Sequence, residues 1–115
     1  MRLVISGSRT ITDRQKVRSI LEAQEFTTLI HGGARGVDRF ADEFAREKGI
    51  EVVVIRPNWR LGRGAGLAAN KEMAGLADKL VAIHDGKSQG TAHMVKLMRG
   101  LGKPVDYHRL DGASD

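Results

Sequence analysis

Short apolar runs alternate with longer amphipathic stretches along this chain. Five runs rich in Val, Ile and Leu are typical of strands buried in a parallel sheet, and they cover residues 2–6, 27–31, 51–55, 79–84 and 103–107. Between them, apolar residues recur at three- and four-residue spacing, which predicts helices over residues 12–23, 37–48, 65–76 and 91–101. The pattern therefore predicts a regular alternation of strands and helices.

This alternation indicates the fold class, because strands that alternate with helices form parallel sheets through right-handed crossovers. We expect an α/β fold, a Rossmann-like, doubly wound parallel sheet of about five strands with helices on both faces. Pro104 has no N–H to donate to a neighbouring strand, and such a residue does not suit the middle of a sheet. The last strand is therefore expected at an edge. Residues 1–108 are expected to form this single domain, and the polar residues 109–115 a flexible tail.

Composition narrows the class of protein. Of the 115 residues, 41% are hydrophobic and 29% are charged, and none is cysteine. These values are ordinary for a water-soluble globular domain, and no apolar run approaches the ~20 residues that cross a membrane. The lack of cysteine excludes disulfides and thiolate metal sites, and the four histidines show no metal-ligand spacing. We expect a cytoplasmic protein that uses no metal, cofactor or membrane partner.

The charge balance favours anionic partners. The formal net charge is +5 and the isoelectric point is near 10, which suits a nucleotide, a nucleic acid or an acidic protein surface. Aromatic residues make up only 4% of the chain, and no basic tract with interleaved aromatic residues is present. Extended binding of a single strand by base stacking is therefore disfavoured.

Glycines gather in loops that the predicted topology brings to one edge of the sheet. They follow the first, second and fourth strands, as Gly7-Ser8-Arg9, Gly32-Gly33-Ala34-Arg35-Gly36-Val37-Asp38 and Asp85-Gly86-Lys87-Ser88-Gln89-Gly90-Thr91. Ligands of doubly wound sheets bind at the carboxyl ends of the strands. Because turn chemistry alone does not explain three such loops at one edge, we expect one site for the phosphate and sugar of a nucleotide-like ligand.

The glycines themselves have two interpretations. Backbone amides of Gly32, Gly33 and Gly36, at the start of a helix, are suited to bind a phosphate. The amides of Gly90 and Thr91 form a second cluster of the same kind. The structural alternative is that such glycines allow tight packing and that Thr91 helps to cap a helix.

Four side chains near these loops complete the predicted site. Arg9 and Arg35 have guanidinium groups suited to phosphate oxygens, although surface arginines are often only solvated. Asp38 is placed to accept a hydrogen bond from a ribose hydroxyl or to act as a base, or else to favour the helix dipole. Trp59, the only tryptophan, either covers a base or packs under its loop.

Several motifs taken together resemble a known family. They are Gly7-Ser8-Arg9, His31-Gly32-Gly33-Ala34-Arg35-Gly36-Val37-Asp38, Pro57-Asn58-Trp59, Gly64-Ala65-Gly66 with Asn70 and Met73, Ala77-Asp78 and Gly90-Thr91. Over residues 2–105 the chain is similar to YspA-type, YpsA-related members of the SLOG superfamily. That superfamily also contains the DprA (Smf) recombination mediators and the LOG phosphoribohydrolases, and many small relatives come from bacteria and phages.

The resemblance implies a Rossmann-like fold and a site for a nucleotide or a nucleotide-derived molecule, such as a nucleoside monophosphate or a relative of ADP-ribose or NAD. The expected ligand-binding residues are Gly7, Ser8, Arg9, Gly32, Gly33, Arg35, Gly36, Asp38, Trp59, Asn70, Gly90 and Thr91.

Whether the chain is an enzyme stays open at this point. LOG enzymes carry a Pro-Gly-Gly-x-Gly-Thr-x-x-Glu motif whose glutamate takes part in cleaving the base from the ribose phosphate. When Gly90-Thr91 is aligned with that motif, Met94 stands at the glutamate position. If the chain is an enzyme, the expected reaction is N-glycosidic hydrolysis of a nucleotide, with Asp38 and Arg9 as candidate catalytic residues.

The third loop departs from the family pattern at one position. The family's usual arginine before the asparagine is absent, because Ala69 precedes Asn70. Arg63 or Lys71 is the expected replacement for its polar contact.

Three hypotheses follow for function. The first is that the chain binds a nucleotide-derived ligand in order to sense, sequester or process it. The second is a DprA-like accessory protein that binds single-stranded DNA, which the high isoelectric point favours and the scarcity of aromatic residues does not. The third is a phage-type interaction module with a vestigial pocket. The sheet edge near Pro104 leaves room for a homodimer.

Overall fold

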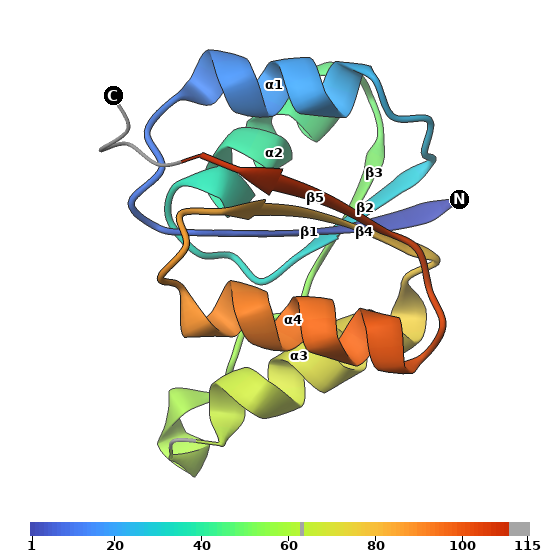
Figure 1. Ribbon diagram of the computed structural model, residues 1–115. Coiled ribbons are helices and arrows are strands. Elements are labelled where there is room, and N and C mark those ends of the chain that lie inside the picture. The colour runs from blue at the N-terminus through green and yellow to red at the C-terminus, as the bar shows by residue number, and fades with distance from the viewer. Residues whose placement is uncertain (63, 111–115) are drawn as a thin grey trace.

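Strands and helices alternate throughout the computed structural model, which describes residues 1–62 and 64–110 (Figure 1). The strands are β1 (Arg2–Gly7), β2 (Thr28–His31), β3 (Glu51–Val54), β4 (Lys79–His84) and β5 (Val105–Arg109). The helices are α1 (Arg14–Glu22), α2 (Val37–Glu47), α3 (Ala65–Leu76) and α4 (Gln89–Gly100), with a short 3-10 turn, η1 (Trp59–Leu61). The predicted α/β alternation is confirmed, and every predicted element lies within two residues of its expected ends.

The strands form one parallel sheet in the order β3-β2-β1-β4-β5. The chain moves outward from β1 to β3, then returns to the other side of β1 and moves outward again. The carboxyl ends of β1 and β4 therefore flank the point where the strand order reverses, which is where doubly wound sheets hold their ligands. β5 is an edge strand, as the position of Pro104 predicts.

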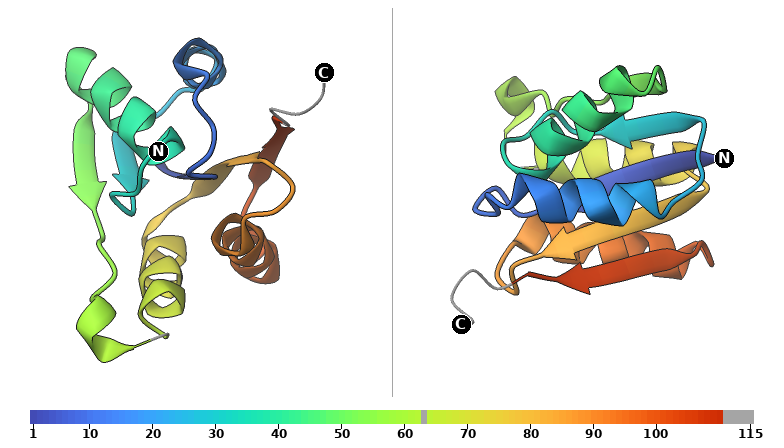
Figure 2. Two further views of the ribbon diagram at one scale, coloured as in Figure 1. Left: turned by 90° about the vertical axis from the view of Figure 1, so that its left-hand side faces the viewer. Right: turned by 90° about the horizontal axis from the view of Figure 1, so that it is seen from above.

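Helices cover both faces of the sheet, so the doubly wound architecture is confirmed. Helices α1 and α2 lie on one face and α3 and α4 on the other (Figures 1 and 2). Because side chains alternate along a strand, Leu3 and Ile5 of β1 pack with the first pair of helices, whereas Val4 packs with the second. The core thus consists of two apolar layers, one on each side of the sheet.

The carboxyl-terminal strand runs further than the pattern predicts. β5 includes Arg109, two residues past the expected end of the strand. The backbone N–H of Leu110 donates to the carbonyl of His84 at 2.9 Å, and its side chain packs against the core. The first two residues of the predicted tail are therefore part of the sheet edge, and the rest of that tail lies outside the described residues. Within the described ranges, no helix is long and apolar enough to cross a membrane.

Candidate functional site

A cleft lies at the carboxyl ends of the strands, where the loops after β1, β2, β3 and β4 meet. It consists of two hollows of about 630 and 680 Å³. The residues that line both hollows are Arg9, Thr10, Gly32, Ala34, Pro57 and Trp59. The predicted site residues that line the cleft are Gly7, Ser8, Arg9, Gly32, Gly33, Arg35, Asp38, Trp59, Asn70, Gly90 and Thr91. The structure therefore brings together every predicted site residue except Gly36.

Gly36 and Gly7 are explained by packing. Gly36 has φ of +70°, which favours glycine, and a Cβ there would lie 2.9 Å from the carbonyl oxygens of both Ser8 and Arg9. A Cβ on Gly7 would collide with Val37 at the start of α2. These two glycines let the β1 loop and the start of α2 approach each other closely, so Gly36 supports the cleft from outside it.

Asp38 holds the loop between β2 and α2 in place. Its side chain is 5% exposed, and its Oδ2 accepts the backbone N–H groups of Gly32 and Ala34, each at 3.1 Å. Burial raises the pKa of Asp38, and the N–H groups of Ala34 and Gly32 act in the opposite direction. Both of these bonds end on Oδ2, and within the described residues no hydrogen bond reaches Oδ1 of this carboxylate, which lines the cleft.

The amide of Gly33 is engaged as well. It donates to Nδ1 of the buried His31 at 2.9 Å, and the other ring nitrogen, Nε2, lies 2.8 Å from Oδ1 of Asp42. Because Nδ1 accepts, Nε2 carries the proton and donates to the carboxylate. His31 thus satisfies a backbone group of the loop. The amides of residues 32–34 all donate inside the protein, so two of the three glycines of the predicted phosphate cradle, Gly32 and Gly33, have amides that are already engaged.

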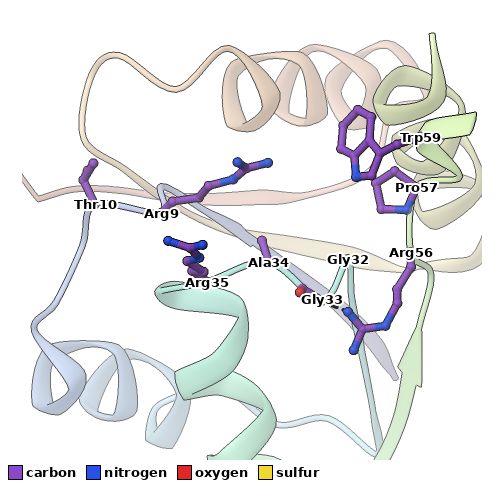
Figure 3. Close-up of a pocket in the computed structure, with 9 residues that line it drawn as sticks. All are labelled: Arg9, Thr10, Gly32, Gly33, Ala34, Arg35, Arg56, Pro57 and Trp59. Atoms are coloured by element: carbon purple, nitrogen blue, oxygen red, sulfur yellow. Dashed lines mark hydrogen bonds between the residues drawn. The ribbon is translucent and has the colours of Figure 1, made fainter. Parts of the chain in front are cut away.

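Positive charge on this side of the cleft comes from arginine side chains instead. Arg9 and Arg35 are both exposed, and Figure 3 shows the Arg9 side chain extending from the β1 loop toward Trp59. Arg56, which the prediction omitted, lies at the end of β3 and donates from Nη1 to the carbonyl of Gly33 at 3.3 Å. Its position directly after an apolar strand is the feature of the sequence that indicates a place at this edge of the sheet. Three guanidinium groups therefore line this side, which we call the arginine wall.

Trp59 lies open to solvent at the mouth of the cleft. Its side chain is 61% exposed, so it does not pack under its loop. A Cβ added to Gly66 would lie 3.3 Å from the indole ring, which shows how closely α3 approaches one edge of that ring. The neighbouring lining is apolar: it consists of Pro57, Leu67, Ala69 and Met73. This second side of the cleft, the apolar wall, presents a flat aromatic surface and aliphatic contacts.

The loop after β4 closes the third side of the cleft through Asp85. Its carboxylate accepts the backbone N–H groups of Lys87 at 2.8 Å and Ser88 at 2.9 Å, and the Thr10 hydroxyl at 2.8 Å. These donors, Lys87 foremost, hold the pKa of Asp85 far below its usual range. The Asp85 amide in turn donates to Oγ of the buried Ser8 at 2.9 Å. Ser8 and Asp85 therefore tie the β1 loop to the β4 loop.

The N-terminus of α4 lies in the same part of the cleft. Ser88 caps the helix, because its Oγ accepts the N–H of Thr91 at 3.3 Å, so the capping side chain is that of Ser88 and Thr91 supplies the capped amide. His84 supports the cap from below: its Nε2 donates to the carbonyl of Ser88 at 2.9 Å, and its Nδ1 accepts the Tyr107 hydroxyl at 2.7 Å. Nothing lies within 4 Å of a Cβ added to Gly90, so this glycine opens the first turn of α4 to the cleft.

Asn70 of α3 is oriented by two hydrogen bonds. Its Nδ2 donates to the carbonyl of Gly90 at 3.2 Å and lies 3.1 Å from Nδ1 of His93. Burial, together with the positive charges of Lys71 and Lys96, lowers the pKa of His93, which keeps Nδ1 free to accept. Both contacts involve Nδ2, and among the described residues no hydrogen bond reaches the amide oxygen of Asn70.

Two residues are the predicted replacements for the missing family arginine. Lys71 lies on α3 but is not among the residues that line the cleft, and Arg63 lies outside the described residues. Within residues 1–62 and 64–110, no group of three or more His, Asp or Glu side chains is arranged to hold a metal ion.

One solved structure is similar to this chain in fold, and one phage protein is similar to it in sequence. DNA processing protein A (DprA) of Streptococcus pneumoniae has a TM-score of 0.82 and 17% sequence identity over 98% of this chain, which spans about half of that protein (52%). At this identity the likeness shows the fold alone. The Gene 61 protein of Mycobacterium phage D29 is 37% identical over 117 residues, which cover 90% of this chain and 93% of that protein. Residues 1–62 match the model of the family described as YspA, cpYpsA-related SLOG, and with the phage relative this match shows that the chain belongs to the YspA, cpYpsA-related SLOG family.

Proposed function

We propose that the cleft binds a nucleotide or a nucleotide-derived ligand through its phosphate, sugar and base. The observation that carries the proposal is the contrast between its two walls: exposed guanidinium groups of Arg9 and Arg35 on one side, and the exposed Trp59 ring beside aliphatic side chains on the other. Guanidinium groups bind phosphate oxygens, and an exposed indole stacks on a base. A nucleotide combines these two chemistries in one molecule.

The proposed place of the sugar lies between the two walls. Asp38 keeps Oδ1 for a ligand and Asn70 keeps its amide oxygen, and both residues line the larger hollow. Both atoms accept hydrogen bonds, which the hydroxyl groups of a ribose donate. If the site is also catalytic, Asp38 is the group that would take a proton, because its pKa is raised by burial.

Differential scanning fluorimetry with AMP, ADP-ribose and NAD tests the proposal. A ligand at a hundred times its dissociation constant stabilises a fold by about 2.7 kcal/mol, and we expect that at least one of the three raises the melting temperature. Arg9→Gln and Trp59→Ala should each reduce the shift. Arg99→Gln, which removes the same charge from an exposed position on α4, is the matched control and should keep it. No shift with any of the three contradicts the proposal.

Product analysis of the same incubations separates binding from catalysis. Mass spectrometry of AMP after incubation detects free adenine if N-glycosidic hydrolysis takes place. Loss of adenine release in Asp38→Asn, with AMP binding retained, would support the role of Asp38 as a catalytic base. Unchanged AMP after prolonged incubation would limit the proposal to binding.

Single-stranded DNA is the second candidate ligand. It is favoured by the net charge of +5 and by the fold shared with the protein titled DNA processing protein A. Fluorescence anisotropy of a labelled oligonucleotide distinguishes the two candidates. Affinity that falls steeply with salt and is unaffected by excess AMP would favour DNA on a surface separate from the nucleotide cleft. Displacement of the oligonucleotide by AMP would instead place both in the cleft.

A further inference from the structure

A second cavity lies behind the loop between β2 and α2. Its volume is about 340 Å³. The residues that line it are His31, Gly33, Ala34, Arg35, Arg39, Asp42, Arg46, Val54 and Arg56. Four of these, Gly33, Ala34, Arg35 and Arg56, also line the cleft. The cleft and this arginine-rich cavity are therefore neighbouring spaces that share part of their lining.

The positive charge in this cavity is only partly neutralised. Its four guanidinium groups face a single carboxylate, Asp42, which pairs with Arg46 at 2.9 Å and accepts from His31 at 2.8 Å. Arg39 has only a longer contact, 3.7 Å, with Glu43 outside the cavity, and Glu43 also lies 3.3 Å from Arg14. Among the described residues, neither Arg35 nor Arg56 forms an ion pair.

Like charges repel, so a cavity that gathers four arginines is stabilised by an anion that lies between them. Guanidinium groups offer planar pairs of N–H donors that match the oxygens of a phosphate. Arg39 is exposed, with 75% of its side chain accessible. It therefore gives up few contacts with the protein when its guanidinium group turns toward a phosphate. The chemistry of the cavity is therefore that of a phosphate site.

We propose that this cavity is a second phosphate site and that the ligand carries two phosphate groups, one at Arg9 in the cleft and one among the arginines behind the loop. Arg35 and Arg56 line both spaces and connect them. The inference rests on the proposed function for the first phosphate only; the second site stands on its own arginines. The second phosphate belongs either to the diphosphate of a small nucleotide or to the phosphodiester of a strand.

Isothermal titration calorimetry with three probes tests this site. AMP has one phosphate, ADP-ribose has a diphosphate, and the dinucleotide pApA has a terminal phosphate and a phosphodiester. Hydrogen bonds to a charged group contribute about 1.5–3 kcal/mol, so one of the two-phosphate probes should bind at least tenfold more tightly than AMP. A preference for ADP-ribose assigns the site to a diphosphate, and a preference for pApA assigns it to a strand.

Variants of the second cavity give the decisive comparison. Arg39→Gln with Arg46→Gln should reduce the two-phosphate preference to less than threefold and leave AMP affinity unchanged, because neither residue lines the cleft. Arg46 also holds Asp42, and through it His31, so Arg39→Gln alone is the second variant if the double variant is destabilised. Arg99→Gln removes the same single charge as Arg39→Gln from an exposed position on α4 and should keep the full preference.

The outcomes separate this inference from the proposed function. Equal affinity of the native protein for all three probes, or a preference that survives in both cavity variants, overturns the second site, while binding of AMP still supports the cleft. If no nucleotide binds but inorganic pyrophosphate binds and loses affinity in Arg39→Gln, the second site stands and the proposed function falls. If pyrophosphate and all nucleotides fail to bind, both are overturned.

Discussion

The carboxylate of Asp38 lies 3.1 Å from the backbone nitrogen of Gly32, and the same oxygen accepts the N–H of Ala34 at the same distance. A side chain in the first turn of α2 thus fixes the loop that precedes the helix. The loop contributes residues to the lining of both the cleft and the neighbouring cavity. Two of its amides therefore depend on one buried carboxylate.

Removal of that carboxylate should destabilise the protein. Asp38→Ala leaves two N–H groups without an acceptor, and each such buried group costs about 1–3 kcal/mol. We expect the free energy of unfolding in urea to fall by about 2–4 kcal/mol. Asp38→Asn keeps an acceptor oxygen and should cost less than half as much. A loss below about 1 kcal/mol in Asp38→Ala would show that the loop amides find other partners.

Substitution by alanine should change the stability of the protein in opposite directions at two glycines. Gly36→Ala places a Cβ 2.9 Å from the carbonyl oxygens of Ser8 and Arg9 at φ of +70°, and we expect a loss of at least about 2 kcal/mol in stability. Gly75 lies inside α3 with nothing within 4 Å of an added Cβ. Gly75→Ala should stabilise the protein by about 0.5–1 kcal/mol. Thermal unfolding of both variants checks the pair, and equal effects would contradict the packing described for Gly36.

Asp85 should give the protein a specific acid sensitivity. Its folded-state pKa is depressed, so its contribution to stability is present above the unfolded value, about 3.9, and is lost as pH falls toward the folded value. At pH 6 the free energy of unfolding of the native protein should be about 1 kcal/mol higher than that of Asp85→Asn. The difference should shrink as pH falls from 4 toward 2. A difference in unfolding free energy that stays constant over this range would show that the carboxylate charge is not involved.

Trp59 should report on the cleft directly, because it is the only tryptophan and is 61% exposed. We expect fluorescence emission close to that of indole in water and ready quenching by acrylamide. Saturating AMP should protect the ring from quenching. Trp59→Ala should change the free energy of unfolding by no more than about 0.5 kcal/mol, as surface substitutions do. A large loss of stability would mean that the ring supports the fold instead of serving as a free binding surface.

The fold could be predicted from the sequence because its signals are local and repeated. Strand runs and helix periods are read within single elements, and their alternation determines the topology. The ends of helices and strands are harder to predict, because they depend on contacts with other elements. Gly90 was expected to precede α4, yet the cap at Ser88 starts the helix at Gln89. Pairing with β4 carries β5 on to Arg109.

The site was predictable in outline and less so in detail. Parallel topology brings the loop ends together, so the lining residues followed from position along the chain. The role of each glycine depends on what lies opposite, and for Gly7 that is Val37, thirty residues away. Likewise the partner of His31 is Asp42 on the next helix. Such pairings are properties of the assembled molecule and leave no local pattern in the sequence.

Because the strand order reverses between β1 and β4, the two sides of the cleft come from different halves of the sequence. The arginine wall comes from residues 1–62, the part that matches the family model. Gly66, Leu67, Ala69, Asn70 and Met73 of α3, and the first turn of α4, come from the other half. Substitutions in α3 and α4 can therefore reshape the lining beside the Trp59 ring without touching the arginine wall, so the two parts of the cleft are free to diverge separately.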